Sequence, residues 1–139
     1  MRSLYRYLSM AVATGVIIQA AAIAWGVFGL AHDTDAGVIV DKNYEGNFGF
    51  ALHSIIGWMV LPIVGLAFLL VGIALRSIDG ALKWAGIVFG LVVLQLVLAG
   101  ISFGAPVVGL LHGVNAILIL LASLKAIYVV PKAASAVEA

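Results

Sequence analysis

Residues 106–130 read PVVGLLHGVNAILILLASLKAIYVV, an apolar run whose most polar members are His112, Asn115 and Lys125. In a helix rising about 1.5 Å per residue, a run of this length exceeds the roughly 30 Å hydrocarbon core of a bilayer. Three comparable apolar runs precede it, at about residues 8–30, 48–75 and 82–103. The sequence therefore predicts four transmembrane helices.

The composition agrees with this membrane assignment. Hydrophobic residues make up 65% of the 139 residues and charged residues 9%, and the mean hydropathy is +1.25, whereas soluble domains carry roughly 25% charged residues. We expect an integral membrane protein whose first partner is the lipid bilayer. The net charge of +1 and the dispersed cations argue against a nucleic-acid partner. The chain has no cysteine, which excludes disulfides, thiolate ligands and iron–sulfur clusters.

The connections between the runs predict the topology. Residues 31–47 form the one sizeable loop, while Ser77–Gly80 is a turn signal, and Gly104 and Pro106 separate the last two runs. Short connections make sequential helices antiparallel neighbours. We expect a single all-α domain over residues 1–139, an integral membrane four-helix up-down-up-down bundle with an outer loop at residues 31–47.

The cations predict the orientation, because Lys and Arg are retained on the cytoplasmic side. Lys42 alone falls in the long loop; the other cations lie at the N-terminus, in the second connection and at the C-terminal end, namely Arg2, Arg6, Arg76, Lys83, Lys125 and Lys132. Both termini are expected in the cytoplasm. Residues 1–30 also resemble a secretory signal, but the length of the apolar run favours a membrane anchor.

Two histidines stand out inside the predicted spans. His53 and His112 each lie about a turn and a half past the start of the second and fourth runs. Because alternate spans run in the same direction, the two imidazoles are expected at matching depth, in the outer half of the bilayer. Ionisable groups within spans are rare and usually functional. Two facing imidazoles are the axial ligands of a bis-histidine heme iron, so the pattern predicts one such site.

Small residues surround both histidines and would leave room for a flat macrocycle. Small residues also serve close helix packing without any cofactor, so this signal has two interpretations. Asn115 is either part of the site or an interhelical hydrogen-bonding residue. The predicted cofactor-binding set is His53, His112, Gly49, Gly57, Gly109, Gly113, Ala116 and Asn115, with His53 and His112 as metal ligands.

A ligating imidazole needs an acceptor for its second ring N–H. We expect a backbone carbonyl one turn earlier, near Gly49 or Val108. Gln95, a lone amide in the third run, is expected to make an interhelical hydrogen bond. His32 lies beside the acids of the long loop, where a solvated loop is the simpler interpretation and a divalent cation the alternative.

Two short motifs resemble a known family. Residues 52–57 read LHSIIG and residues 111–116 read LHGVNA, and both resemble the ligand helices of small bacterial b-type membrane cytochromes. More distantly, the chain looks like one four-helix half of heme A synthase, although it lacks that enzyme's cysteine pair and second bundle. It also resembles uncharacterised bacterial four-helix membrane proteins with a Leu-His-x-x-Asn-Ala signature. The cytochrome resemblance implies one heme b held by His53 and His112 in a bacterial cytoplasmic membrane.

The expected function is electron transfer, or an accessory role in a respiratory or redox membrane complex with other membrane subunits or further copies of the chain. Nucleotide-binding, metalloprotease and nucleophile-elbow motifs are missing, which makes enzymatic activity of the chain alone the less favoured expectation. The alternative is a cofactor-free structural subunit whose histidines hydrogen-bond between helices. A heme-handling enzyme is the third possibility.

Overall fold

The computed structural model describes residues 1–131, which are helical apart from turns and connections. The long N-terminal helix is α1, and the second span consists of α2, a π-helical segment and α3. The third span is α4, and the fourth joins a short 3₁₀ segment to α5. The bounds are α1 Arg2–Asp35, α2 Phe48–Ile55, the π segment Ile56–Val60, α3 Leu61–Ala74, α4 Ala81–Ser102, the 3₁₀ segment Pro106–Val108 and α5 Gly109–Ile127.

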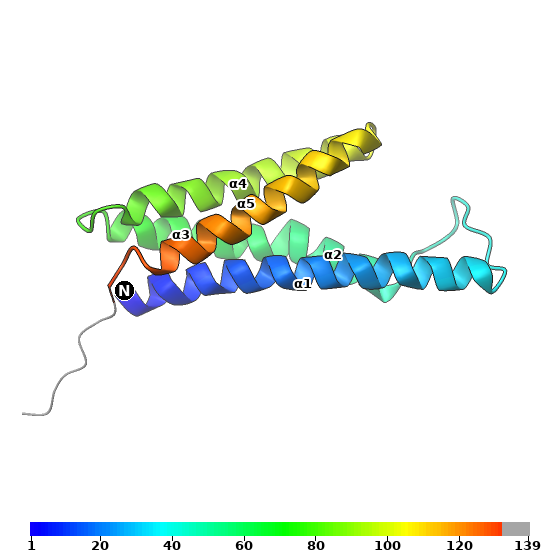
Figure 1. Cartoon of the computed structure of the whole chain (residues 1–139), viewed down its shortest axis with the longest axis horizontal. Helices are drawn as coiled ribbons and strands as arrows, with labels where there is room; N and C mark the ends of the chain where they lie inside the picture. Colours follow the sequence, from blue (N-terminus) through cyan, green and yellow to red (C-terminus); the bar gives the residue numbers. More distant parts are fainter. Residues whose placement is uncertain (132–139) are drawn as a thin grey trace, which may run out of the picture.

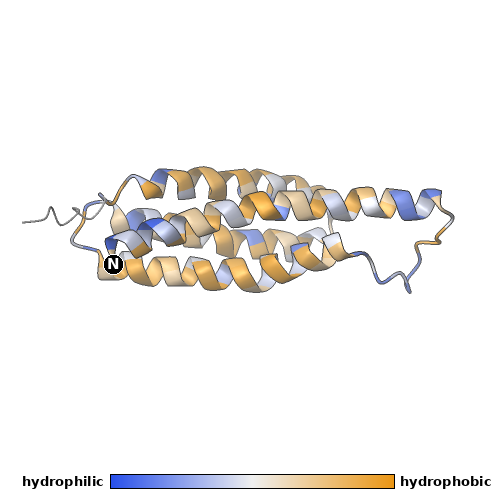
Figure 2. Cartoon of the chain, turned by 90° about the horizontal axis from the view of Figure 1, so that it is seen from below, coloured by the Kyte–Doolittle hydropathy of each residue, from blue (hydrophilic) through white to orange (hydrophobic). Residues whose placement is uncertain are grey.

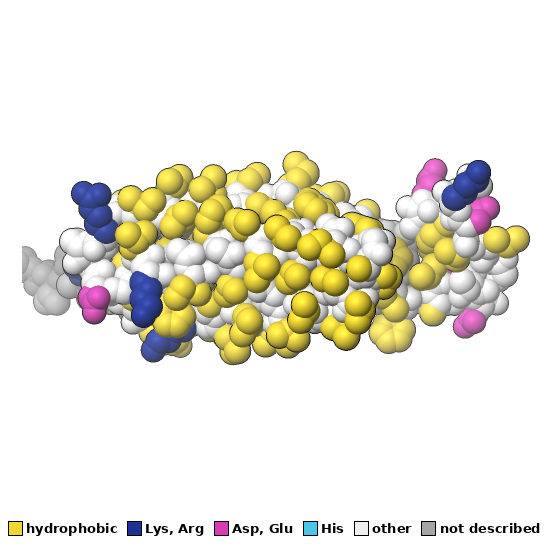
Figure 3. Space-filling model, turned by 90° about the horizontal axis from the view of Figure 1, so that it is seen from above, with side chains coloured by type: hydrophobic (Ala, Val, Ile, Leu, Met, Phe, Trp, Pro, Cys, Tyr) yellow, Lys and Arg dark blue, Asp and Glu magenta, His cyan; other side chains and the backbone are white. Residues whose placement is uncertain are grey.

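Within residues 1–131, four helical spans are long and apolar enough to cross a membrane, as expected of a multi-pass membrane protein: Arg2–Asp35, Phe48–Ala74, Ala81–Ser102 and Pro106–Ile127. Hydrophobic residues predominate along the middle of the helices (Figure 2), and the charged side chains on the face drawn in Figure 3 lie toward the two ends of the molecule. Lys132, counted among the cytoplasmic cations, lies outside the described residues.

The helix ends differ from the ends of the apolar runs. The first helix begins at Arg2 and continues to Asp35, so the connection to α2 starts at residue 36 instead of 31. An apolar run marks the part of a helix suited to lipid, whereas the helix itself continues as long as its backbone hydrogen bonds do. Thr34 extends α1 by donating its hydroxyl to the carbonyls of Leu30 and Ala31. At the other end of the chain, α5 ends at Ile127, three residues earlier than expected.

The second span changes helix type one turn after His53. Its five π-helical residues, Ile56–Val60, are followed by Pro62 in the first turn of α3. A proline inside a span removes one backbone donor and crowds the carbonyl four residues earlier, and a π turn is one way to accommodate this. The wider turn rotates α3 relative to α2. As a result, α2 and α3 place their side chains differently around the bundle.

The bundle is packed most tightly at the end that holds the N-terminus. The Tyr5 hydroxyl donates to the carbonyl of Ala81 at 2.9 Å, and the Ser9 hydroxyl donates to the carbonyl of Ser123 at 2.6 Å. Tyr5 also stacks on Phe68 with ring centroids 4.6 Å apart. The side chains of Tyr5, Ser9, Phe68 and Ser123 are all fully buried. This end ties α1, α3, α4 and α5 together.

Toward the opposite end, the α4–α5 pair diverges from α1 (Figure 1). There α1 keeps close contact with α2. Asn47 caps α2 by accepting from the amides of Gly49 and Phe50, and it donates its side-chain amide to the carbonyl of Gly26 at 2.8 Å. Gly49 is buried against the α1 backbone. The bundle therefore consists of two helix pairs that are joined at one end and separate toward the other.

We predict that Gly49→Ala destabilises the fold. The added Cβ would lie 2.7 Å from Cα of Gly26 and 2.8 Å from the carbonyl oxygen of Ala22, and backbone cannot move aside as a flexible side chain can. Overpacking of this kind costs about 1–3 kcal/mol. Reversible unfolding in mixed micelles, followed by circular dichroism, measures the loss. Gly86→Ala is the matched control, because its Cβ meets nothing within 4 Å; equal stability of the two variants would contradict this packing.

Candidate functional site

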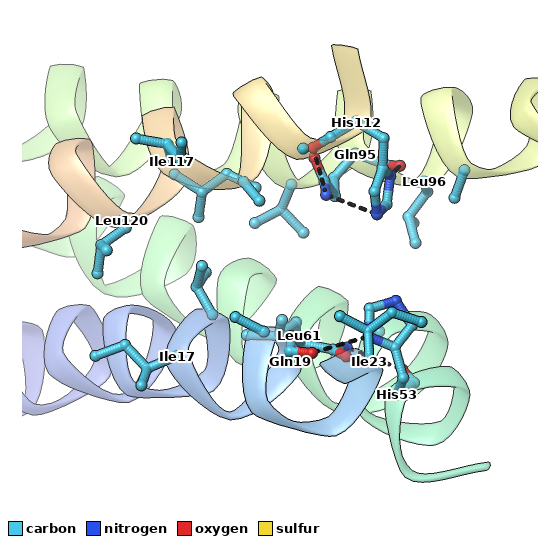
Figure 4. A pocket seen from close by; sticks show the side chains of 18 of the residues that line it. Ile17, Gln19, Ile23, His53, Leu61, Gln95, Leu96, His112, Ile117 and Leu120 are labelled. Atoms are coloured by element: carbon cyan, nitrogen blue, oxygen red, sulfur yellow. Dashed lines mark hydrogen bonds between the residues drawn. The ribbon is translucent and has the colours of Figure 1, made fainter. Parts of the chain in front are cut away.

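His53 on α2 and His112 on α5 face each other across the space between the two helix pairs. Their ring centroids lie 6.4 Å apart, and the ring planes are inclined by 59°. In Figure 4 each ring turns one nitrogen toward the gap and the other toward a neighbouring helix. The structure thus brings together the two histidines that the sequence singled out, although they are 59 residues apart in the chain (112 minus 53).

Gln19 of α1 holds His53 from behind. The His53 ring places Nδ1 3.1 Å from the backbone carbonyl oxygen of Gln19, and the Gln19 side-chain amide donates to the backbone carbonyl of His53 at 2.9 Å. The side chain of each residue therefore contacts the backbone carbonyl of the other. Because each contact uses a backbone group of a regular helix, the orientation of the ring is fixed by the α1–α2 crossing.

Gln95 of α4 holds His112 in the same manner. His112 places Nδ1 3.3 Å from the backbone carbonyl oxygen of Gln95, and the Gln95 amide donates to the backbone carbonyl of His112 at 3.1 Å. The second pair adds one contact, since the Gln95 amide nitrogen also lies 3.0 Å from Nε2 of His112. Each half of the molecule thus contributes one glutamine–histidine pair.

Asn115 fixes the orientation of the Gln95 amide. Its side-chain nitrogen donates to Oε1 of Gln95 at 2.7 Å and to the backbone carbonyl of Leu91 at 2.9 Å. Since Oε1 accepts from Asn115, the Gln95 nitrogen points toward His112. Asn115 is buried, with 3% of its surface exposed, and acts on the site through Gln95.

These contacts determine the tautomer of both rings. A backbone carbonyl only accepts, so Nδ1 of each imidazole carries the proton and Nε2 keeps its lone pair. At His112 the lone pair accepts from the Gln95 amide. Within the described residues, Nε2 of His53 has no hydrogen bond (Figure 4). Each ring directs Nε2 away from its supporting glutamine carbonyl.

A partly open cavity of about 400 Å³ lies between the helix pairs and includes both rings. Gly57, Gly113 and Ala116 of the predicted set line it. Gly49 and Gly109 do not: Gly49 packs against α1, and Gly109 lies nearest to Ser102. The sequence could not separate these glycines, because all of them lie within one turn of a histidine. Apart from the two histidines, Gln19 and Gln95, the lining is apolar and includes Val16, Ile17, Ile23, Leu61, Val92, Leu96, Ile117 and Leu120.

The chemistry available in the cavity is limited to nitrogen donors and amides. Within residues 1–131 there is no group of three or more His, Cys, Asp or Glu side chains that would hold a metal ion by themselves. The two imidazoles are the donors that a metal in this cavity would use, so its remaining ligands would have to come from elsewhere. Gln19 adds an amide oxygen that is buried without a hydrogen-bond partner in the described structure.

The sequence analysis missed one of the two supporting glutamines. Gln95 was expected to make an interhelical hydrogen bond, and it does, whereas Gln19 received no role. The expectation that carbonyls near Gly49 or Val108 accept from the rings was wrong: the carbonyls of Gln19 and Gln95 lie there instead. The physical reason is that a histidine side chain projects away from its own helix axis, toward the backbone of the neighbouring helix. The sequence signal that could have identified these acceptors was the glutamine in each neighbouring helix, Gln19 in α1 and Gln95 in α4.

His32 lies apart from this site, exposed in the last turn of α1. The neighbouring Asp33 accepts a hydrogen bond from the Tyr44 hydroxyl at 2.8 Å, which raises the pKa of Tyr44. This contact ties the loop to the end of α1.

The chain matches no protein-family profile, no curated protein and no solved structure. The chemistry of the site is therefore argued from its own residues.

We predict that both His53 and His112 carry a proton on Nδ1. Nitrogen-15 NMR of histidine-labelled protein in bilayers or micelles reports the tautomer of each ring. His32, which is exposed, is the internal control and should average between tautomers. An Nε2-protonated form of either His53 or His112 would contradict the hydrogen-bond pattern described above.

Proposed function

We propose that the protein is a b-type cytochrome of the membrane, with one heme b between α2 and α5 and His53 and His112 as its axial ligands. The observation that carries the proposal is the separation of the two rings. Metal–nitrogen bonds of imidazole are about 2 Å long, and a ring nitrogen lies roughly 1.2 Å from its ring centroid. Two rings on one metal therefore have centroids about 6.4 Å apart, and the observed distance is 6.4 Å.

The set of donors favours a porphyrin over a bare metal ion. Two neutral imidazoles supply two ligands and no negative charge, whereas protein sites for single metal ions use three or four ligands or more. A porphyrin brings four in-plane nitrogens and two negative charges of its own. The apolar lining of the cavity suits the faces of the macrocycle, and Gly113 and Ala116 leave backbone accessible beside His112. The residues present fit the group.

The supporting glutamines match what an axial ligand needs. A ligating histidine donates its second N–H to a carbonyl, which fixes the tautomer and raises the basicity of the ring. The carbonyls of Gln19 and Gln95 are in that position. Because the acceptors are backbone carbonyl oxygens of two helices, the two rings are oriented without a bound ligand.

A bound heme b would supply one-electron chemistry. In an up-down-up-down bundle with both termini in the cytoplasm of a bacterial cell, the site lies in the outer half of the bilayer. One heme at one depth suits a subunit that exchanges electrons with a partner in a respiratory or redox complex. The many exposed apolar side chains along the spans, such as Leu70, Phe103 and Leu110, are available to lipid and to partner subunits alike.

The cofactor-free structural subunit is the second candidate. The observation in its favour is that the contacts to Gln19 and Gln95 already satisfy Nδ1 of both rings. However, Nε2 of His53 has no hydrogen bond within the described residues and lies at a largely apolar cavity. A purely structural role does not explain this.

We predict that the protein expressed with ample heme purifies with one heme per chain and a low-spin bis-histidine spectrum. His53→Ala and His112→Ala should each abolish the low-spin spectrum and most heme retention, whereas the control His32→Ala should behave as wild type. Absorption spectroscopy and pyridine hemochrome analysis measure both.

Colourless wild-type protein under these conditions would favour the structural subunit. Mass spectrometry of the extracted porphyrin addresses the heme-handling enzyme: an altered macrocycle would support it, and unmodified heme b supports a cytochrome.

The proposed orientation makes a separate prediction. Alkaline phosphatase fused after residue 40 should be active in a bacterial host, and the same fusion after residue 79 or at the C-terminus should be inactive, because this reporter works outside the cytoplasm only. Activity at the C-terminus would contradict the proposed topology.

A further inference from the structure

The two halves of the site differ in one respect that bears on ligand exchange. Within residues 1–131, Nε2 of His53 makes no hydrogen bond, whereas Nε2 of His112 accepts one from Gln95. Building on the proposed cytochrome, we propose that His112 is the exchangeable ligand and that a neutral diatomic gas such as CO or NO binds on its side of the heme. Three observations support this proposal.

The first observation is the engagement of Gln95. Its amide nitrogen lies 3.0 Å from Nε2 of His112 and 3.1 Å from the His112 carbonyl oxygen, and its Oε1 accepts from Asn115. Both amide protons and the amide oxygen are thus in use. To bind a metal, His112 has to give up one of these contacts, because a single lone pair on Nε2 serves either the amide or the metal.

The second observation is that Gln19 offers no such competition. Its amide nitrogen donates to the His53 carbonyl at 2.9 Å, and it makes no contact with Nε2 of His53. The Gln19 amide nitrogen lies close to Gly57, since a Cβ added there would be 2.7 Å from it. His53 therefore binds a metal without losing a hydrogen bond.

The third observation is the space beside His112. A Cβ on Gly113 would meet nothing within 4 Å, whereas one on Gly57 would meet the Gln19 amide. Gly113 lines the cavity next to the His112 ring. A small ligand has room on this side, and the apolar lining favours an uncharged one. If His112 left a bound metal, its Nε2 would accept from the Gln95 amide as it does in this structure, so the displaced ring would not be left unpaired.

The test uses heme-loaded, reduced protein and carbon monoxide as the probe. Wild type should bind CO, with loss of the bis-histidine spectrum. Gln95→Leu removes the competitor for Nε2 of His112, so His112 should stay on the iron longer. We expect a fall in CO affinity of about fivefold, the size of one neutral hydrogen bond. The change should appear in the association rate measured by flash photolysis, while the dissociation rate stays unchanged.

The matched comparison is Gln19→Leu, which removes the equivalent amide from the other pair. Because that amide makes no contact with Nε2 of His53, the CO association rate should fall clearly less than in Gln95→Leu. Equal effects of the two substitutions would overturn the assignment of His112. So would a wild-type protein that binds heme and takes up no CO. A change confined to the dissociation rate would show that Gln95 contacts the gas instead of competing for the imidazole, and would also overturn the proposal.

A measurement without heme keeps the proposal separate from the proposed function. In heme-free protein, the nitrogen-15 shift of Nε2 should show a hydrogen-bonded acceptor at His112 and a free lone pair at His53, and Gln95→Met, of similar length, should make His112 resemble His53. Identical Nε2 shifts in wild type would overturn the inference even if heme binds. Absence of heme binding would overturn the cytochrome proposal, and the proposed gas site with it.

Discussion

The site depends on one interaction that occurs twice: an imidazole Nδ1–H faces a backbone carbonyl of the neighbouring helix, and the glutamine that carries this carbonyl returns a hydrogen bond to the backbone of the histidine. In an apolar environment an unpaired polar group is costly, so each residue of the pair holds the other in place. Neither ring can turn without breaking a contact. The distance between the two rings is consequently set by how the two helix pairs meet.

The relative placement of the two helix pairs depends on contacts at the end of the bundle that holds the N-terminus. The buried contacts of Tyr5 and Ser9 join helices from both pairs near the N-terminus, while α4 and α5 diverge from α1 beyond them (Figure 1). Side chains are fully buried at one end, and a cavity lies between the helix pairs where the histidines face each other. The close α1–α2 crossing at Gly49 then keeps His53 in register with Gln19.

The four spans and the pairing of the two histidines could be predicted from the sequence, whereas Gln19, the π turn and the roles of the glycines could not. Hydropathy alone predicts four spans, because lipid demands long apolar helices. The pairing of His53 with His112 follows from their equal distance from the span starts. Gln19 was not recognised, since a single amide in a long apolar helix carries no positional information until its neighbour is known. The π turn at Ile56–Val60 was not predicted either; Pro62 signals a distortion but not its form. The distinction between lining glycines and packing glycines requires coordinates.

The length of α1 has a consequence of its own. Its 34 residues span about 50 Å, roughly 20 Å more than the hydrocarbon core is thick. Tilt absorbs only part of such a mismatch, so in a bilayer the last turns of this helix would extend past the hydrocarbon core. The segment that the Tyr44–Asp33 hydrogen bond ties to these turns would then be held at the membrane surface by a helix end instead of by a flexible chain.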